Sequence, residues 1–95
     1  MTREYKNIQE TIDEIIDAIN NEFNYEYPIY PITEGEIEIV FSPIRKIRIV
    51  HGSGVFVFQV KEKINDNKYK IEKDVWCVYK ERVIELSIKT IKEQS

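Results

Sequence analysis

The sequence predicts one α+β domain, in which an N-terminal amphipathic helix packs on a five-stranded antiparallel meander sheet. Three observations carry this prediction. Isoleucines near the start of the chain recur at the helical period, and the residues after Gly35 alternate between apolar and charged side chains, as strands do. The chain has 95 residues, the size of one domain with one core. If the sheet curls, the same pattern predicts a small barrel.

The helix is predicted over residues 4–24. Asn7, followed three residues later by Glu10, resembles a capping box at its start. A connector over residues 25–35 should follow, because Pro28 and Pro31 lack N–H groups and favour extended conformations before them. The apolar stripe of the helix, which should cover one face of the sheet, consists of Ile8, Ile12, Ile15, Ile16, Ile19 and Phe23.

The remainder predicts five strands, with short turns that set their register. A two-residue turn at Gly52-Ser53 would pair Ile49 with Phe56, and every other turn also brings apolar residues opposite apolar residues. The further pairs expected are Ile39 with Ile47, Ile37 with Ile49, Phe58 with Val75, Phe56 with Cys77, and Cys77 with Ile84. The predicted strands span residues 36–41, 45–51, 54–63, 68–79 and 82–91.

The last of these strands has a competing interpretation. Ile84, Ile88 and Ile91 also fit one side of a helix, whereas Ser87 and Thr90 favour a strand. We therefore predict a strand. The inner face of the sheet should then carry Ile37, Ile39, Phe41, Ile47, Ile49, Phe56, Phe58, Val60, Ile71, Val75, Cys77, Ile84, Leu86 and Ile88, with Lys73 as an isolated charge that extends outward past the helix.

The outer face should carry an apolar patch at one end, although the exposed face of an antiparallel sheet is usually polar. Two explanations stay open: a protein interface, either in a homodimer or with another partner, or a cover formed by the tyrosine-rich connector or the chain ends. We predict the interface. The patch consists of Val50, Val55, Val57, Trp76, Val78 and Val83.

Charge is unevenly distributed along the chain. Residues 1–43 hold ten acidic and two basic residues, and residues 44–95 hold seven acidic and twelve basic residues. An acidic file on the helix lies opposite the isoleucine stripe, and no Lys or Arg follows Lys6 until Arg45 to pair with it. The simpler explanation is a solvated helix face. The alternative, which our leading hypothesis adopts, is that the file docks on a basic partner protein in place of phosphates, as small acidic inhibitors from phages and mobile elements do. The file consists of Glu10, Asp13, Glu14 and Asp17.

The hairpin over residues 61–70 has the opposite sign and suggests an alternative function. Basic side chains interleaved with an aromatic ring can follow a single nucleic-acid strand, which would make the chain an RNA or single-stranded DNA binding module. The simpler explanation is a solubilised hairpin tip that protects an exposed edge. The residues concerned are Lys63, Lys68, Tyr69 and Lys70.

No motif in the sequence indicates an enzyme, a cofactor or a metal site. His51 is the only histidine and is predicted at a turn, whereas Cys77 is the only cysteine and should face the core, so the two do not form a nucleophilic pair. The lone cysteine and the lack of a long apolar run predict a cytoplasmic protein without a membrane segment. Our leading hypothesis is a non-enzymatic, homodimeric protein-binding domain that inhibits a basic, nucleic-acid-binding protein.

Overall fold

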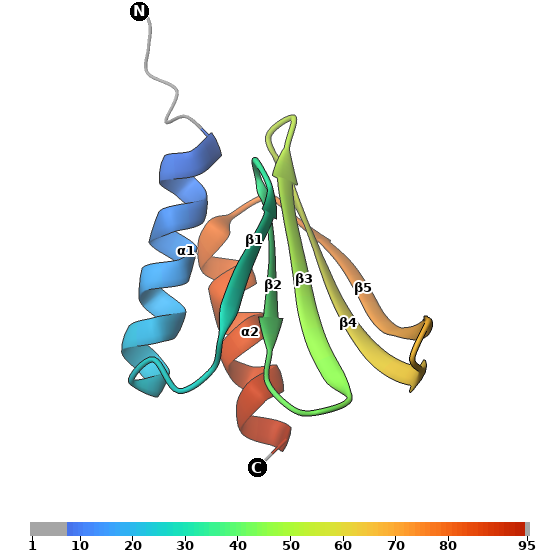
Figure 1. Cartoon of the computed structure of the whole chain (residues 1–95). Helices are drawn as coiled ribbons and strands as arrows, with labels where there is room; N and C mark the ends of the chain where they lie inside the picture. Colours follow the sequence, from blue (N-terminus) through green and yellow to red (C-terminus); the bar gives the residue numbers. More distant parts are fainter. Residues whose placement is uncertain (1–7, 95) are drawn as a thin grey trace, which may run out of the picture.

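A computed structural model describes residues 8–94 of the chain. Its elements follow in the order α1 (Ile8–Phe23), β1 (Ile29–Thr33), β2 (Glu36–Val40), β3 (Arg45–Gly52), β4 (Val55–Asn65), β5 (Lys68–Cys77) and α2 (Lys80–Gln94) (Figure 1). The predicted cap at Asn7 and the predicted helical start over residues 4–7 lie outside the described part.

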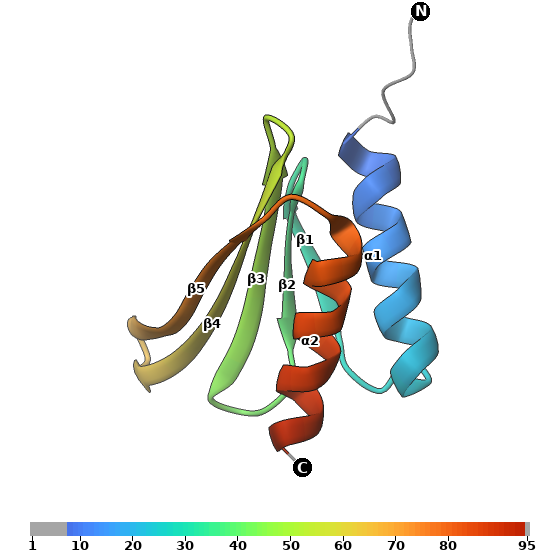
Figure 2. The same ribbon diagram turned by 180° about the vertical axis from the view of Figure 1, so that it is seen from behind.

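The five strands form one antiparallel sheet in the order β1-β2-β3-β4-β5. This confirms the α+β class and the meander. The sheet remains open, so the barrel alternative is wrong. Both helices lie side by side on one face of the sheet, and the other face has no helix over it in residues 8–94 (Figures 1 and 2).

The core lies between the sheet and the helices. Ile12, Ile15 and Ile19 of α1 are buried against it, as the isoleucine stripe predicted. From the sheet, the core takes alternate residues of β2, β3 and β4, and it ends at Cys77. The buried sheet residues are Ile37, Ile39, Ile47, Ile49, Phe56, Phe58, Val60 and Cys77, and Phe41, directly after β2, is buried with them.

The segment predicted as the strand 82–91 is helix α2, and this prediction was wrong. Val83, Leu86, Ser87 and Ile91 lie on one side of the helix and are buried in the core. The two hydroxyl residues that favoured a strand are compatible with a helix because each bonds to the carbonyl four residues earlier. Ser87 Oγ donates to Val83 O at 2.8 Å, and Thr90 Oγ1 donates to Leu86 O at 2.7 Å.

The sheet still has five strands because residues 25–35, predicted as a connector, contribute one of them. The prediction for this segment was therefore also partly wrong. β1 forms within it and pairs with β2, with Pro31 opposite Ile37. Proline is tolerated in β1 because this strand is at the edge of the sheet, where its missing N–H group breaks no ladder on the open side. The connector is thus part of the sheet and does not fold over its outer face.

The register of β2 with β3 and of β4 with β5 agrees with the prediction at Ile37–Ile49, Ile39–Ile47, Phe56–Cys77 and Phe58–Val75. The register of β3 with β4 differs by two residues, because the turn is Ser53-Gly54, where both residues have positive φ. Such a turn matches the twist of the strands. Ile49 therefore pairs with Phe58, and His51 lies within β3, opposite Phe56. A shift of two residues leaves each side chain on its predicted face.

A bulge in the β4–β5 ladder changes the face of one residue. Val60 pairs with Lys73, but the next residue, Lys61, pairs with Ile71, so the register shifts between them. Ile71 was predicted in the core and is instead exposed on the outer side. The Glu72 carboxylate bonds to Arg45, with Arg45 Nη2 at 2.7 Å.

Candidate protein-binding surface

Trp76 is the centre of an exposed apolar region on the uncovered face of the sheet. Trp76 pairs with Val57 across β4 and β5, and Val57 pairs with Val50 across β3 and β4. We call this region the Trp76 surface; it consists of Val50, Val55, Val57, Trp76 and Val78. β-branched side chains at alternate positions of a strand form such a face readily, because their neighbours at the intervening positions fill the core.

The described residues leave the Trp76 surface open. Trp76 is 70% exposed, Val78 is 64% exposed, and the adjoining Tyr79 is 71% exposed. The valines of β3 and β4 are half-buried beneath them. The predicted patch also included Val83, and this was wrong: Val83 is completely buried on the inner side of α2. Because Val83 belongs to the helix, it lies on the opposite side of the sheet from Trp76.

Charged side chains border the Trp76 surface in opposite-sign pairs. Arg48 Nε donates to Glu36 Oε2 at 2.7 Å, and Arg48 Nη1 donates to Gln59 Oε1 at 3.1 Å. Further along the same face, away from Trp76, Lys46 Nζ lies 3.0 Å from Glu38 Oε1. Glu38 and Arg48 are directly opposite in the ladder, as predicted, but the ion pairs form along the diagonals. The border therefore has no dominant sign.

The acidic file of α1 is divided by the fold. Glu14 is ion-paired with Lys80 of α2, and Glu22, further along α1, lies 2.9 Å from Lys92 Nζ. Glu10 also has an interaction partner. Asp13 accepts a hydrogen bond from Gln9 Nε2 at 2.8 Å and, like Asp17, is exposed. Lys80 and Lys92 lie far from α1 in the sequence, so the sequence near α1 did not reveal these ion pairs.

The basic hairpin gains two residues that the sequence did not single out. Lys63 pairs with Tyr69 on the outer side of the β4–β5 ladder, whereas Lys70 pairs with Glu62 one position away and therefore points to the other side. Lys46 and Lys61 are opposite each other in the β3–β4 ladder, and Lys46 Nζ lies 4.2 Å from the centre of the Tyr69 ring. Lys68 is exposed at the end of β5.

His51 and Cys77 are both placed next to Phe56. The His51 ring stacks on the Phe56 ring with centroids 4.1 Å apart, and Cys77 pairs with Phe56 from the other side. Phe56 thus lies between the two residues in the ladder. Burial raises the pKa of the Cys77 thiol, although the charge of Arg82 acts in the opposite direction. A raised pKa lowers the thiolate fraction and with it the reactivity of the thiol.

The following absences apply to residues 8–94, the part of the chain that the structure describes. No group of three or more His, Cys, Asp or Glu residues there could hold a metal ion. Neither described helix is long and apolar enough to cross a membrane. Comparison of the chain with protein-family models, with curated proteins and with solved structures found no match.

Proposed function

We propose that this chain is a small, non-enzymatic protein-binding domain that forms a homodimer through the Trp76 surface. The observation that carries the proposal is the exposure of Trp76 beside Val57 and Val78 on a sheet face without a cover in the described residues. Removing one large apolar side chain from water contributes about 1.5–3 kcal/mol. Contiguous exposed apolar side chains of this kind, bordered by charges, are typical of protein interfaces.

A second copy of the chain is the partner that fits the border of this surface. A two-fold interface brings the same surface of each subunit together, so it needs acidic and basic groups in balance. Glu36 and Arg48 provide both signs within one ion pair beside Val50. A partner of one dominant sign would gain little electrostatic attraction from such a border.

The experiment compares two exposed apolar residues. Trp76→Ser should convert a dimer to a monomer in size-exclusion chromatography with light scattering, while circular dichroism remains that of the wild type. Ile64→Ser is the control, because Ile64 is 60% exposed but lies near the tip of the β4–β5 hairpin. The control should remain a dimer. A monomeric wild-type protein, or a Trp76→Ser variant that associates as tightly as the wild type at the same low protein concentration, would contradict the homodimer.

We further propose that α1 docks on a basic, nucleic-acid-binding protein and so inhibits it, in the manner of small acidic phage proteins. Asp13 and Asp17 support this because both carboxylates are exposed. α1 and the Trp76 surface lie on opposite sides of the sheet, so a dimer would leave α1 accessible (Figure 2). The single cysteine, which is unpaired, supports a cytoplasmic location.

The alternative function, binding of RNA or single-stranded DNA, is favoured by one observation, the position of Lys46 over Tyr69. Together with Lys61 and Lys63, this ring forms a basic and aromatic cluster at the end of the outer face away from Trp76. Fluorescence anisotropy with a labelled single-stranded oligonucleotide distinguishes the two functions. Binding that weakens steeply with salt and is lost in Lys61→Glu/Lys63→Glu would support the alternative. No binding at low salt would exclude it.

A further inference from the structure

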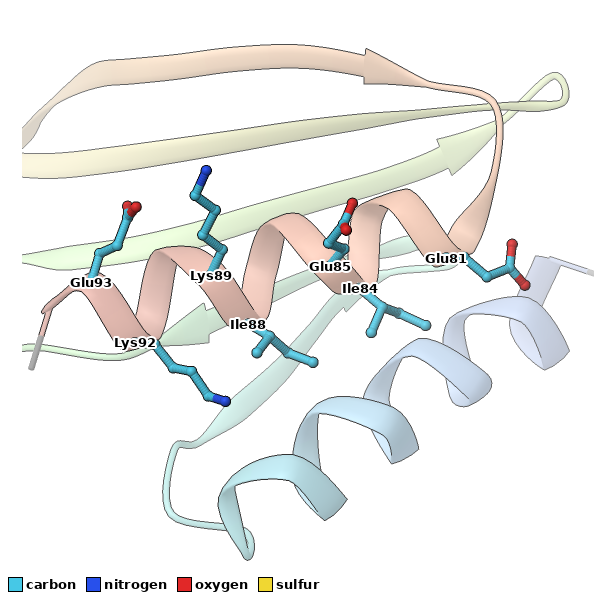
Figure 3. A pocket seen from close by; sticks show the side chains of 7 residues that line it. All are labelled: Glu81, Ile84, Glu85, Ile88, Lys89, Lys92 and Glu93. Carbon is cyan, nitrogen blue, oxygen red and sulfur yellow. The ribbon is translucent and has the colours of Figure 1, made fainter.

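The solvent-facing side of α2 carries a second group of exposed residues, separate from the Trp76 surface. Its buried side consists of Val83, Leu86, Ser87, Thr90 and Ile91. The opposite side forms a shallow, open hollow lined mainly by carbon atoms (Figure 3). We call this side the α2 stripe; it consists of Glu81, Ile84, Glu85, Ile88, Lys89, Lys92 and Glu93.

Two isoleucines occupy the middle of the α2 stripe. Ile84 and Ile88 are half-buried, and Figure 3 shows both projecting from the helix. Ile84 is packed partly against the core, whereas Ile88 is not among the residues that pack there, so Ile88 and the exposed part of Ile84 form the apolar centre of the stripe. An apolar centre one turn long, with charges at both ends, is the arrangement found along contacts between two helices.

The charges of the α2 stripe are ordered along the helix. Glu81 and Glu85 lie in its N-terminal half, and Lys89 and Lys92 lie in its C-terminal half, where Glu93 at the margin of the stripe is the one exception. This order stabilises the helix itself, because acids favour the N-terminal and bases the C-terminal end of the macrodipole. It also makes the stripe complementary to its own copy in the antiparallel direction.

We infer that the α2 stripe binds the α2 stripe of a second copy of this chain, with the two helices antiparallel. The two-fold axis would pass near the middle of the stripe, between Ile84 and Ile88. Ile84 of each copy would then pack on Ile88 of the other. If the axis lies midway between Glu81 and Lys92, these two residues are level. Glu85 and Lys89, and likewise Ile84 and Ile88, are then one residue from level, about 1.5 Å along the axis, and remain within reach of each other.

The contacts within one copy leave this arrangement intact. Lys92 is paired with Glu22 of α1, but its side chain is 59% exposed and its ammonium group has three donors. Glu85 is paired with Arg82, and its side chain is 67% exposed. Both groups therefore have capacity for a second partner at the surface.

This contact does not depend on the Trp76 surface, because α2 covers the opposite face of the sheet (Figure 1). Two self-complementary surfaces on opposite sides of one chain allow assemblies larger than a dimer. The α2 contact is also small, and interfaces of this size are weak. A dimer held by the α2 contact alone should therefore dissociate at low protein concentration, whereas a dimer held by a large apolar interface would not.

The test uses sedimentation velocity over a concentration series, in the Trp76→Ser background, so that the outer face does not contribute. The parent variant should show a weak monomer–dimer equilibrium. Glu81→Lys/Glu85→Lys makes the charged residues of the stripe basic apart from Glu93, and Lys89→Glu/Lys92→Glu makes all of them acidic. Each of these two charge-reversed variants, measured alone, should dimerise about tenfold or more weakly than the parent. An equimolar mixture of the two should form a heterodimer.

Two variants guard against indirect effects. Lys92→Glu also places an acid near Glu22, so Lys89→Glu alone serves as a second acidic variant that leaves the α1–α2 ion pair in place. Lys68→Glu/Lys70→Glu changes the net charge equally at the β4–β5 hairpin, and it should associate like the parent. The inference is overturned if the parent is monomeric throughout, or if mixing the two charge-reversed variants restores no association. A failed Trp76→Ser experiment alone would leave this prediction unaffected.

Discussion

Trp76 lies directly opposite Val57 in the β4–β5 ladder, yet 70% of the tryptophan is exposed. Their neighbours Phe56 and Cys77 form the adjacent pair and are buried beneath the helices. The same two strands thus bury one face with residues of this chain and leave an equally apolar pair open on the other. This asymmetry is the main reason for proposing a second protein surface over Trp76.

Two valines of the predicted patch should respond differently to truncation. Val83 is completely buried, so Val83→Ala removes core contacts and should lower the free energy of unfolding by about 2 kcal/mol. Val78 is 64% exposed, so Val78→Ala should change it by less than about 0.5 kcal/mol. Urea denaturation of both variants, performed on the Trp76→Ser monomer, measures the difference. Equal effects would contradict the assignment of Val83 to α2 and the core.

Two glycines with positive φ should also differ. A Cβ atom at Gly35 would lie 2.7 Å from the carbonyl oxygen of His51, so Gly35→Ala combines backbone strain with a clash and should cost more than about 3 kcal/mol. A Cβ at Gly54 meets no atom within 4 Å, so Gly54→Ala should cost only the strain, about 1–2 kcal/mol. Thermal unfolding of the two variants checks the order, and a more stable Gly35→Ala protein would refute the β2–β3 geometry.

Glu72 should contribute to the acid sensitivity of the fold. Burial acts to raise its pKa, but the hydrogen bond and charge of Arg45, with further contributions from Glu62 and Lys70, hold the pKa below its usual value of 4.5. A lowered folded-state pKa stabilises the fold above the unfolded value, and this stabilisation is lost as the pH falls through the folded value.

Glu72→Gln should therefore have a lower free energy of unfolding than the wild type at neutral pH. This difference between the two proteins should become smaller below pH 4.5. Denaturant unfolding at a series of pH values measures it. Asp66→Asn is the control, because the Asp66 side chain is 97% exposed. A difference independent of pH would show that Arg45 does not shift the pKa of Glu72.

The acidic docking proposal predicts a salt-dependent interaction through α1. Binding of a labelled lysine-rich peptide at low salt should weaken in Asp13→Asn/Asp17→Asn, because the exposed carboxylates would be lost. Glu81→Gln/Glu85→Gln is the matched control, since it removes the same charge from α2. Equal weakening in both variants would indicate attraction by net charge alone and would contradict a docking face on α1.

The faces of the strands were predictable because apolar alternation fixes them wherever one face is buried. Alternation combined with the correct turn positions gave the pairs Ile37–Ile49 and Phe58–Val75. The Ser53-Gly54 turn was missed because a shift of two residues keeps the same faces, so alternation cannot choose between the two turns. The Ser53-Gly54 turn is distinguished only by its backbone, in which both central residues have positive φ.

Helix α2 was missed because alternation at Ile84, Leu86 and Ile88 imitates a strand. A helical signal was nevertheless present: a tight hairpin at Lys80-Glu81 would need residues suited to positive φ, and neither is glycine or asparagine. The error placed Val83 in the outer patch and hid the α2 stripe. The ion pairs of Glu14 and Glu22 with α2 were equally hidden, because they join residues far apart in the sequence.

The most direct measurement of the central claim is the fluorescence of Trp76, which is the only tryptophan in the chain. As protein concentration rises, its emission maximum should shift to shorter wavelength, with the same midpoint as the change from monomer to dimer seen by light scattering. Such a joint transition would mean that dimerisation buries Trp76. Emission that stays typical of an exposed indole while the protein dimerises, or a protein that stays monomeric, would contradict the proposed interface.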